Sequence, residues 1–140
     1  MKVSVRCPVF PTEDEDQILQ HISSIFPSVS FDLNEGNRRK WLIADITGFK
    51  SLDYLRLLIH DSRIIDTARK IINTSWTGTI FTIKLDKQAL TRQKANLIDE
   101  SDDPPLGFVE IIGHCSSDKE YESFLHWFTP LTKDGKIVRH

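Results

Sequence analysis

Hydrophobic residues recur every three or four positions between Ser51 and Asn73, the longest helix-like stretch in the chain. This spacing is typical of a helix that turns one face to a core. On one straight helix, however, the apolar face of the first half is rotated away from that of the second half. Either one helix is buried over a broad arc, or the segment breaks near Asp61 and Ser62, which are good N-cap residues. We favour the break, and Ser51 is the predicted cap at the start.

Alternation of apolar and polar residues predicts the strands. They cover residues 2–10, 29–33, 41–46, 79–85 and 108–114, with 95–99 as a further candidate. The turn at residues 34–37 favours a hairpin between the second and third strands. A last helix is expected around residues 121–128, closed by Pro130, and Asp134 and Gly135 predict a turn in the tail.

The first helix is expected to begin just after Pro11 and to end at Pro27. Thr12 is the predicted N-cap, and Glu15 is its capping-box partner. The four acids at residues 13–16 lie where the helix dipole favours negative charge. Four adjacent acids also suggest metal binding or acid–base catalysis, but a helix start explains all of them and is the favoured interpretation.

Helices and strands mingle along the chain without regular βαβ alternation, and a hairpin lies in the middle. This order predicts an α+β fold: a two-layer sandwich with a largely antiparallel sheet and helices on one face. A chain of 140 residues is long enough to bury a core without disulfides or metals. One domain spanning residues 1–140 is therefore expected.

The formal net charge of −2 excludes a uniformly basic nucleic-acid binder but allows a local basic patch. Cys7 and Cys115 are the only cysteines, so two reduced, buried thiols are expected rather than a disulfide framework. The sequence contains no signal-peptide core and no apolar run long enough to span a membrane. These features predict a cytoplasmic protein.

Catalytic signatures are absent from the sequence, which has no GxGxxG, P-loop, GxSxG or HExxH motif. The five histidines are scattered. Only His114 and Cys115 are adjacent metal-ligand types, and neighbours on a strand point to opposite faces. We therefore predict no metal site, no small-molecule cofactor and no enzyme activity.

Cations gather in the second half of the chain's longest helical segment and around the strand and turn that follow it. They are Arg63, Arg69, Lys70, Lys84, Lys87, Arg92 and Lys94. If that strand lies beside the end of the helix, these side chains form one patch that attracts phosphates; the alternative is that they are simply solvated. Aromatic stacking partners are not evident among them.

Asp66 lies three residues from both Arg63 and Arg69 and is expected to pair with them as a structural acid. For the basic run at residues 38–40, a solvated turn is favoured over a dedicated phosphate contact.

Several segments together resemble a known family. They are VSVRCPVFPTEDEDQIL…IFP near the start, SRIIDTARKII and FTIKLDKQAL in the middle, and LGFVEIIGHC and FLHWFTPLTKDGKIV near the end. The chain resembles the archaeal uncharacterised protein family 0201 over nearly its whole length. Matching motif positions select Arg63, Asp66, Arg69, Lys87 and Gln88 as residues to test. Phe128 and Leu90 depart from the family pattern, in which smaller residues are typical.

The resemblance implies an archaeal cytoplasmic protein without established catalytic activity. It also implies a fold similar to that of the fifth protein of the large ribosomal subunit, and a relation to predicted RNA-binding, exosome-linked proteins. Our first hypothesis is an RNA-binding or ribonucleoprotein-associated module that uses the basic patch, with Gln88 among its contacts. The alternative is a non-enzymatic protein-interaction module or homodimer that does not bind nucleic acid.

Overall fold

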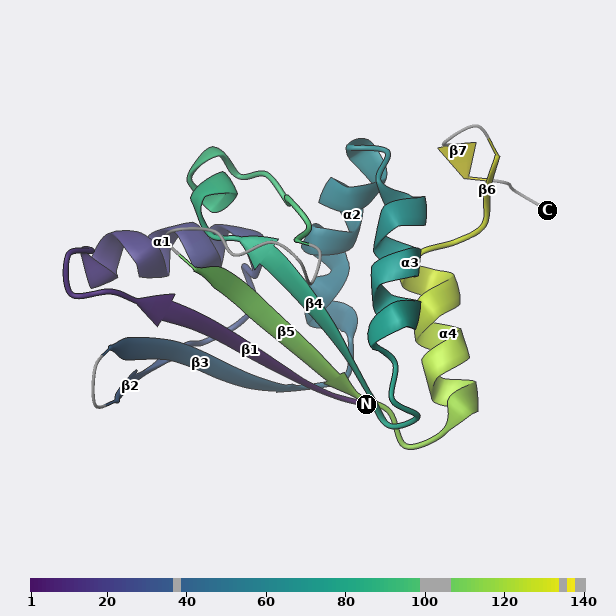
Figure 1. Ribbon diagram of the computed structural model, residues 1–140, viewed down its shortest axis with the longest axis horizontal. Helices are drawn as coiled ribbons and strands as arrows, with labels where there is room; N and C mark the ends of the chain where they lie inside the picture. The colour runs from purple at the N-terminus through teal and green to yellow at the C-terminus, as the bar shows by residue number, and fades with distance from the viewer. Residues whose placement is uncertain (37–38, 99–106, 134–135, 138–140) are drawn as a thin grey trace.

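A five-stranded antiparallel sheet forms one layer of the protein, in a computed structural model that describes residues 1–36, 39–98, 107–133 and 136–137 (Figure 1). The strands lie in the order β2-β3-β1-β5-β4. Their bounds are β1 (Lys2–Val9), β2 (Asp32–Glu35), β3 (Lys40–Thr47), β4 (Ile80–Asp86) and β5 (Phe108–His114). The predicted hairpin is confirmed, since β2 pairs with β3 in antiparallel register. A separate two-stranded ribbon joins β6 (Thr132–Lys133) and β7 (Lys136–Ile137), and the turn predicted at 134–135 lies outside the described residues.

Four α-helices form the second layer. They are α1 (Glu15–Ile25), α2 (Asp53–Asp61), α3 (Ile65–Ser75) and α4 (Asp118–Phe128), and the short 3-10 helices are η1 (Lys50–Leu52) and η2 (Gln88–Arg92). In Figure 1, α1 and α2 lie behind the sheet, while α3 and α4 lie on the β4 side. The predicted α+β class is confirmed. None of the described helices is long and apolar enough to cross a membrane.

The sheet has a buried face and an open face because strand residues alternate between its two sides. Val3, Val5 and Cys7 of β1 are buried, as are Phe81 and Ile83 of β4. The Phe81 ring stacks on Phe124 of α4 with ring centroids 4.7 Å apart, so this face is the one that the helices cover. Residues in between, such as Arg6, point to the opposite side.

The segment 51–73 is broken as predicted, because α2 ends at Asp61 and α3 begins at Ile65. Arg63, between the two helices, has φ of 58°, a left-handed conformation that a continuous helix does not allow. The predicted cap at Ser51 is wrong. Ser51 lies within η1, and its buried hydroxyl has no hydrogen-bond partner among the described residues. The N-cap of α3 is Ile64, which makes no side-chain cap.

The start of α1 also differs from its prediction. Asp14 is the N-cap, and its Oδ1 accepts hydrogen bonds from the backbone N–H groups of Asp16 and Gln17. Thr12 is therefore not the cap, and Glu15 is not a capping-box partner but the first residue of the helix. Glu15 instead pairs with Lys40 of β3 at 3.3 Å.

The strand expected at 95–99 is reduced to a single bridge between Leu97 and Leu85, and Asp99 lies outside the described residues. This segment still occupies part of the outer edge of β4: the N–H of Asp86 donates to Asn96 O at 2.8 Å, and the N–H of Ile98 donates to Lys84 O at 2.9 Å. Nearer the other end of β4, the N–H of Thr82 donates to Ser75 Oγ at the end of α3. The short turn of helix predicted after β4 is η2.

Candidate nucleic-acid interface

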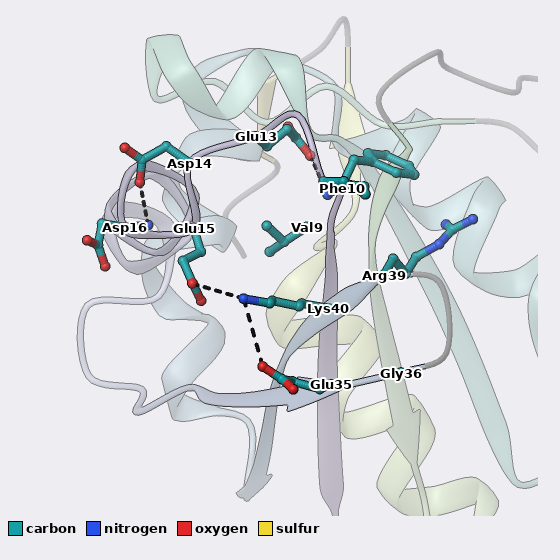
Figure 2. Close-up of a pocket in the computed structure, with 11 residues that line it drawn as sticks. Val9, Phe10, Glu13, Asp14, Glu15, Asp16, Glu35, Gly36, Arg39 and Lys40 are labelled. Atoms are coloured by element: carbon teal, nitrogen blue, oxygen red, sulfur yellow. Dashed lines mark hydrogen bonds and ion pairs between the residues drawn. The ribbon is translucent and has the colours of Figure 1, made fainter.

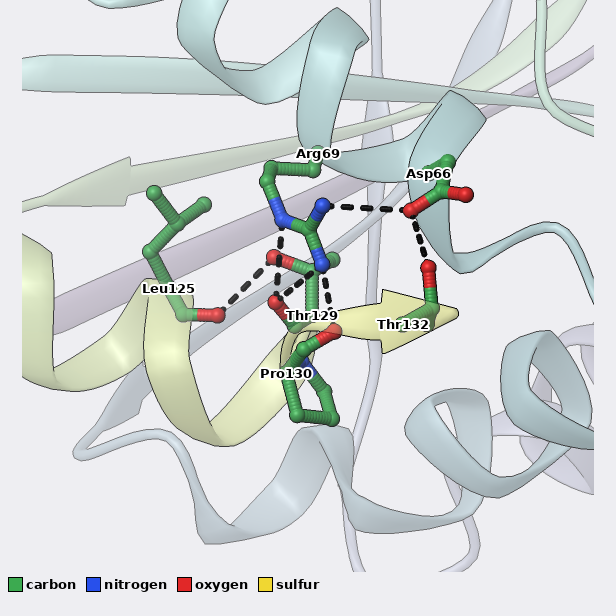
Figure 3. Close-up of polar contacts among 6 residues, drawn as sticks. All are labelled: Asp66, Arg69, Leu125, Thr129, Pro130 and Thr132. Atoms are coloured by element: carbon green, nitrogen blue, oxygen red, sulfur yellow. Dashed lines mark hydrogen bonds and ion pairs between the residues drawn. The ribbon is translucent and has the colours of Figure 1, made fainter. Parts of the chain in front are cut away.

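Arg69 anchors the C-terminal end of α4 (Figure 3). Its Nε and Nη2 donate to the carbonyl oxygen of Thr129 at 3.1 and 3.0 Å, and Nη2 also donates to that of Pro130. Nη1 pairs with Asp66 at 3.1 Å, and Asp66 in turn accepts from the hydroxyl of Thr132. A cation at a helix C-terminus satisfies carbonyl groups that have no partner within the helix. Four of the five N–H groups of the guanidinium thus have partners within the fold.

Lys87 is buried, with its side chain only 3% exposed. Its Nζ donates to Pro8 O at 2.8 Å and to Glu13 Oε1 at 2.5 Å, and it lies 4.8 Å from the centre of the Phe10 ring. The same Glu13 oxygen accepts from the N–H of Phe10. Lys87 therefore joins β1, the loop before α1 and the start of η2, and it is not part of the surface that a large ligand reaches.

Five of the six remaining predicted residues divide between two hollows. Lys70 and Lys84 line a groove of about 610 Å³ between α3 and β4. Gln88, Arg92 and Lys94 line a smaller hollow of about 260 Å³ beside η2, together with Ser62. Arg63 is exposed next to Ser62. The structure therefore brings the predicted cations together in small groups, with Arg69 and Lys87 in structural positions.

Aromatic rings lie on the open face of the sheet, where cations cover them. The guanidinium carbon of Arg6 lies 4.8 Å from the centre of the Trp41 ring, and that of Arg39 lies 5.6 Å from it. On the other side of β1, Lys84 Nζ lies 4.8 Å from the centre of the Phe108 ring. These distances are typical of cation–π contacts. The five residues come from four segments of the chain, so the sequence pattern alone did not group them.

Register places these groups on one surface. Arg6 is opposite Ile43 on β3 and Glu110 on β5, and Glu110 is opposite Lys84 on β4. Residues two positions apart share a face, which puts Trp41 and Phe108 beside them. The side chains of Trp41 and Phe108 are partly exposed. We refer to Arg6, Arg39, Trp41, Lys84 and Phe108 as the aromatic–cation face.

Acids alternate with the cations on this side of the sheet. Asp45, on β3, accepts a hydrogen bond from Ser4 at 2.8 Å, and Glu110 lies between Arg6 and Lys84 in the register. Within the described ranges, neither Arg6 nor Lys84 forms an ion pair. The cationic groups are therefore available, but the face as a whole is of mixed charge.

The acid cluster at the start of α1 surrounds a hollow of about 510 Å³ (Figure 2). Four of the five carboxylates around it have partners: Glu13 binds Lys87, Asp14 caps the helix, and Lys40 lies between Glu15 and Glu35. Across the described part of the chain, no three His, Cys, Asp or Glu residues are placed to hold a metal ion. The four carboxylates with partners thus hold the start of α1 and the neighbouring strands in place.

Both cysteines are buried and free. Burial raises the pKa of the Cys7 thiol to about 12, which leaves it protonated near neutral pH. Burial likewise raises the pKa of Cys115. Since the thiolate is the nucleophilic form, neither residue has the environment of a reactive cysteine.

Comparison with known proteins identifies the family. The sequence model of a family described as RNA binding matches residues 2–114. A UPF0201 protein of Sulfolobus acidocaldarius is 31% identical, over 96% of this chain and 90% of its own length. The chain belongs to the archaeal UPF0201 family. This finding confirms the resemblance inferred from the sequence segments.

Relatives of the family extend the comparison. A UPF0200/UPF0201 protein of Archaeoglobus fulgidus is 31% identical over 99% of this chain, which spans 40% of that longer protein. The crystal structure of a UPF0201 protein from Methanococcus jannaschii has a TM-score of 0.83 at 22% identity, over 99% of this chain and 100% of that one, and therefore shares its fold. The expected likeness to a ribosomal protein remains a prediction.

Proposed function

We propose that this UPF0201 protein binds single-stranded RNA on the aromatic–cation face of its sheet. The observation that carries the proposal is the placement of Trp41 and Phe108 on the open face, each beside a cation. The description of the matching family as RNA binding supports the same class of ligand.

Unpaired bases stack on aromatic rings or on the planes of guanidinium groups, which is the main way in which proteins hold single-stranded RNA. Trp41 and Phe108 lie on strands that flank β1, about 10 Å apart at the usual strand spacing. Sheet surfaces in common RNA-recognition modules stack two or three bases in this manner. Arg6, Arg39 and Lys84 would then lie beside the phosphates of the stacked nucleotides.

The charge of the face sets the expected salt dependence. Each phosphate contact on a single strand contributes about 0.7 to the slope of log affinity against log salt concentration, so three cations give a slope of about −2. The neighbouring acids Asp45 and Glu110 oppose long-range attraction to RNA. We therefore expect binding that depends more on stacking than on charge.

The test measures fluorescence anisotropy of a labelled single-stranded RNA of about 12 nucleotides, a length within the usual site sizes, across a salt series. Trp41→Ala is expected to weaken binding by about 1–3 kcal/mol, the usual effect of losing one stacked base, or roughly 5- to 150-fold. Arg6→Gln is expected to reduce the salt slope by about 0.7.

Two matched variants serve as controls. Tyr54→Ala removes an exposed ring on α2, behind the sheet, and is expected to leave RNA affinity unchanged (Figure 1). Arg92→Gln removes an exposed cation of the η2 hollow and is expected to leave the salt slope unchanged. Absence of binding at low salt would refute RNA binding. Loss of affinity in Arg92→Gln but not in Trp41→Ala would place the interface at η2 instead.

A further inference from the structure

The groove between α3 and β4 adjoins the aromatic–cation face, because Lys84 belongs to both and Glu110, which also lines the groove, is opposite Lys84 in the register. Its volume of about 610 Å³ lies within the range typical of small-ligand sites. Three kinds of group line it. They are the ammonium groups of Lys70 and Lys84, an apolar wall of Ile71, Leu97 and Ile98, and the carboxylate of Glu110. These three kinds of group match the three parts of a nucleotide.

We propose that this groove binds a nucleotide through its terminal phosphate, either at the end of an RNA strand or as a free nucleoside monophosphate. The RNA-end form rests on the proposed function; the free-nucleotide form does not. The phosphate lies between Lys70 and Lys84, the base contacts the apolar wall, and the ribose lies nearest to Glu110.

The two lysines carry the phosphate part of the argument. Lys70 lies on α3 and Lys84 on β4, the two elements that form the two sides of the groove. No ion pair engages either ammonium group in the part of the chain that the structure describes. A terminal phosphate monoester carries a charge of about −1.5 to −2 at neutral pH, whereas a diester within the strand carries one. Two ammonium groups on facing sides therefore favour a chain end over an internal phosphate.

Glu110 and the apolar residues favour a nucleoside over bare phosphate. A carboxylate repels an anion but accepts hydrogen bonds from ribose hydroxyl groups. Ile71 and Leu97 are partly exposed, so an apolar surface is present for the face of a base. Inorganic phosphate can use the lysines only, and Glu110 works against it.

The experiment measures the affinity of the protein for three forms of one RNA sequence. One form has a 5′ phosphate, one has a 3′ phosphate, and one has hydroxyl groups at both ends. At one of the two ends the phosphate is expected to tighten binding about tenfold, the effect of one charge-assisted hydrogen bond. Lys70→Gln is expected to abolish this difference while leaving the affinity for the hydroxyl-ended RNA unchanged. Lys94→Gln, which removes an exposed lysine outside the groove, is expected to retain it.

A second arm measures binding of a nucleoside monophosphate and of inorganic phosphate by calorimetry, with wild type and Lys70→Gln. The protein could bind the monophosphate but not RNA, and lose monophosphate binding in Lys70→Gln. That result would support nucleotide binding in the groove and refute the proposed function. Equal affinity for phosphate-ended and hydroxyl-ended RNA, without monophosphate binding, would overturn the groove inference and leave RNA binding intact. Equal binding of inorganic phosphate and monophosphate would refute recognition of the nucleoside.

Discussion

Replacing Lys87 with Met tests whether the buried ion pair with Glu13 holds the fold together. The two side chains are 3% and 12% exposed, and the charged atoms lie 2.5 Å apart. Lys87→Met keeps most of the apolar stem but leaves the carboxylate in a largely buried position. Glu13 would keep the N–H of Phe10 as a donor, while Pro8 O would lose the ammonium group. Removing one partner of a buried pair costs about 3–5 kcal/mol, because the other charge remains without compensation.

The assay is reversible urea unfolding of wild type, Lys87→Met, Glu13→Gln and the double variant. In a parallel thermal melt, each kcal/mol lowers the midpoint by about 3 °C near this chain length, so Lys87→Met should lower it by roughly 9–15 °C. The double variant should lose less than the sum of the two single variants, because each single variant leaves one buried charge without its partner and the double variant leaves none. Lys94→Met, which removes an exposed lysine, is expected to change stability by no more than about 0.5 kcal/mol. A loss below about 1 kcal/mol for Lys87→Met, the value of an exposed pair, would refute the reasoning.

Three further predictions follow from the same structure. Arg69→Ala should destabilise the protein by about 2–3 kcal/mol and increase hydrogen exchange at the end of α4, with Arg69→Lys recovering only part of the loss; unchanged exchange there would contradict the role of Arg69. Gly113→Ala should cost about 1–3 kcal/mol in urea unfolding, because the added Cβ would lie 2.2 Å from the buried Phe81 ring; wild-type stability would show that the ring moves freely. Burial raises the pKa of Cys7 from 9.0, and that of Tyr121 from 10.0, to about 12 in each case, so the folded chain binds more protons than the unfolded chain between these values. Stability is therefore fully present below pH 9.0 and lost as the pH rises towards 12, and a urea midpoint that rises over this range would contradict the assignment.

Local patterns predicted most of the elements. The rotation of the apolar face within residues 51–73 indicated the break, which the left-handed Arg63 confirms. Cap assignment failed where a tertiary contact decided the outcome. The Thr12-x-x-Glu15 spacing suggested a capping box, but Glu13 is held by Lys87 and the helix begins after Asp14.

A similar spacing does cap a helix elsewhere. At the start of α4, Ser117 Oγ accepts from the N–H of Glu120, and Glu120 Oε1 accepts from the N–H of Ser116. The hydrogen bond from the N–H of Ser116 and one from the N-terminal ammonium group lower the pKa of the Glu120 carboxyl. The sequence thus carries this spacing at both Thr12 and Ser117, and only Ser117 caps a helix. The Ser/Thr-x-x-Glu spacing therefore does predict helix caps. Tertiary contacts decide which of the two matching positions forms one, and the sequence does not show those contacts.

The candidate interface was harder to predict, because it depends on register. Lys87 and Glu13 are 74 residues apart, and nothing local to Lys87 indicates burial. Trp41 and Phe108 come together only once β3 and β5 are known to flank β1. The distribution of charge along the chain shows where the cations are, but not what each one contacts. It therefore does not separate cations that stabilise the fold, such as Arg69, from those that face solvent, such as Lys70.

The two edges of the sheet have different capacities for joining another strand. On β4, backbone groups of Thr82, Lys84 and Asp86 already have partners in Ser75 and residues 96–98. At the other edge, β2 is only four residues long, is exposed throughout, and carries Asp32 and Glu35. Short, charged edges resist pairing with a second chain. The sheet is therefore protected at both sides against the strand-by-strand growth that leads to aggregation, which leaves its open face available for ligands at high protein concentration.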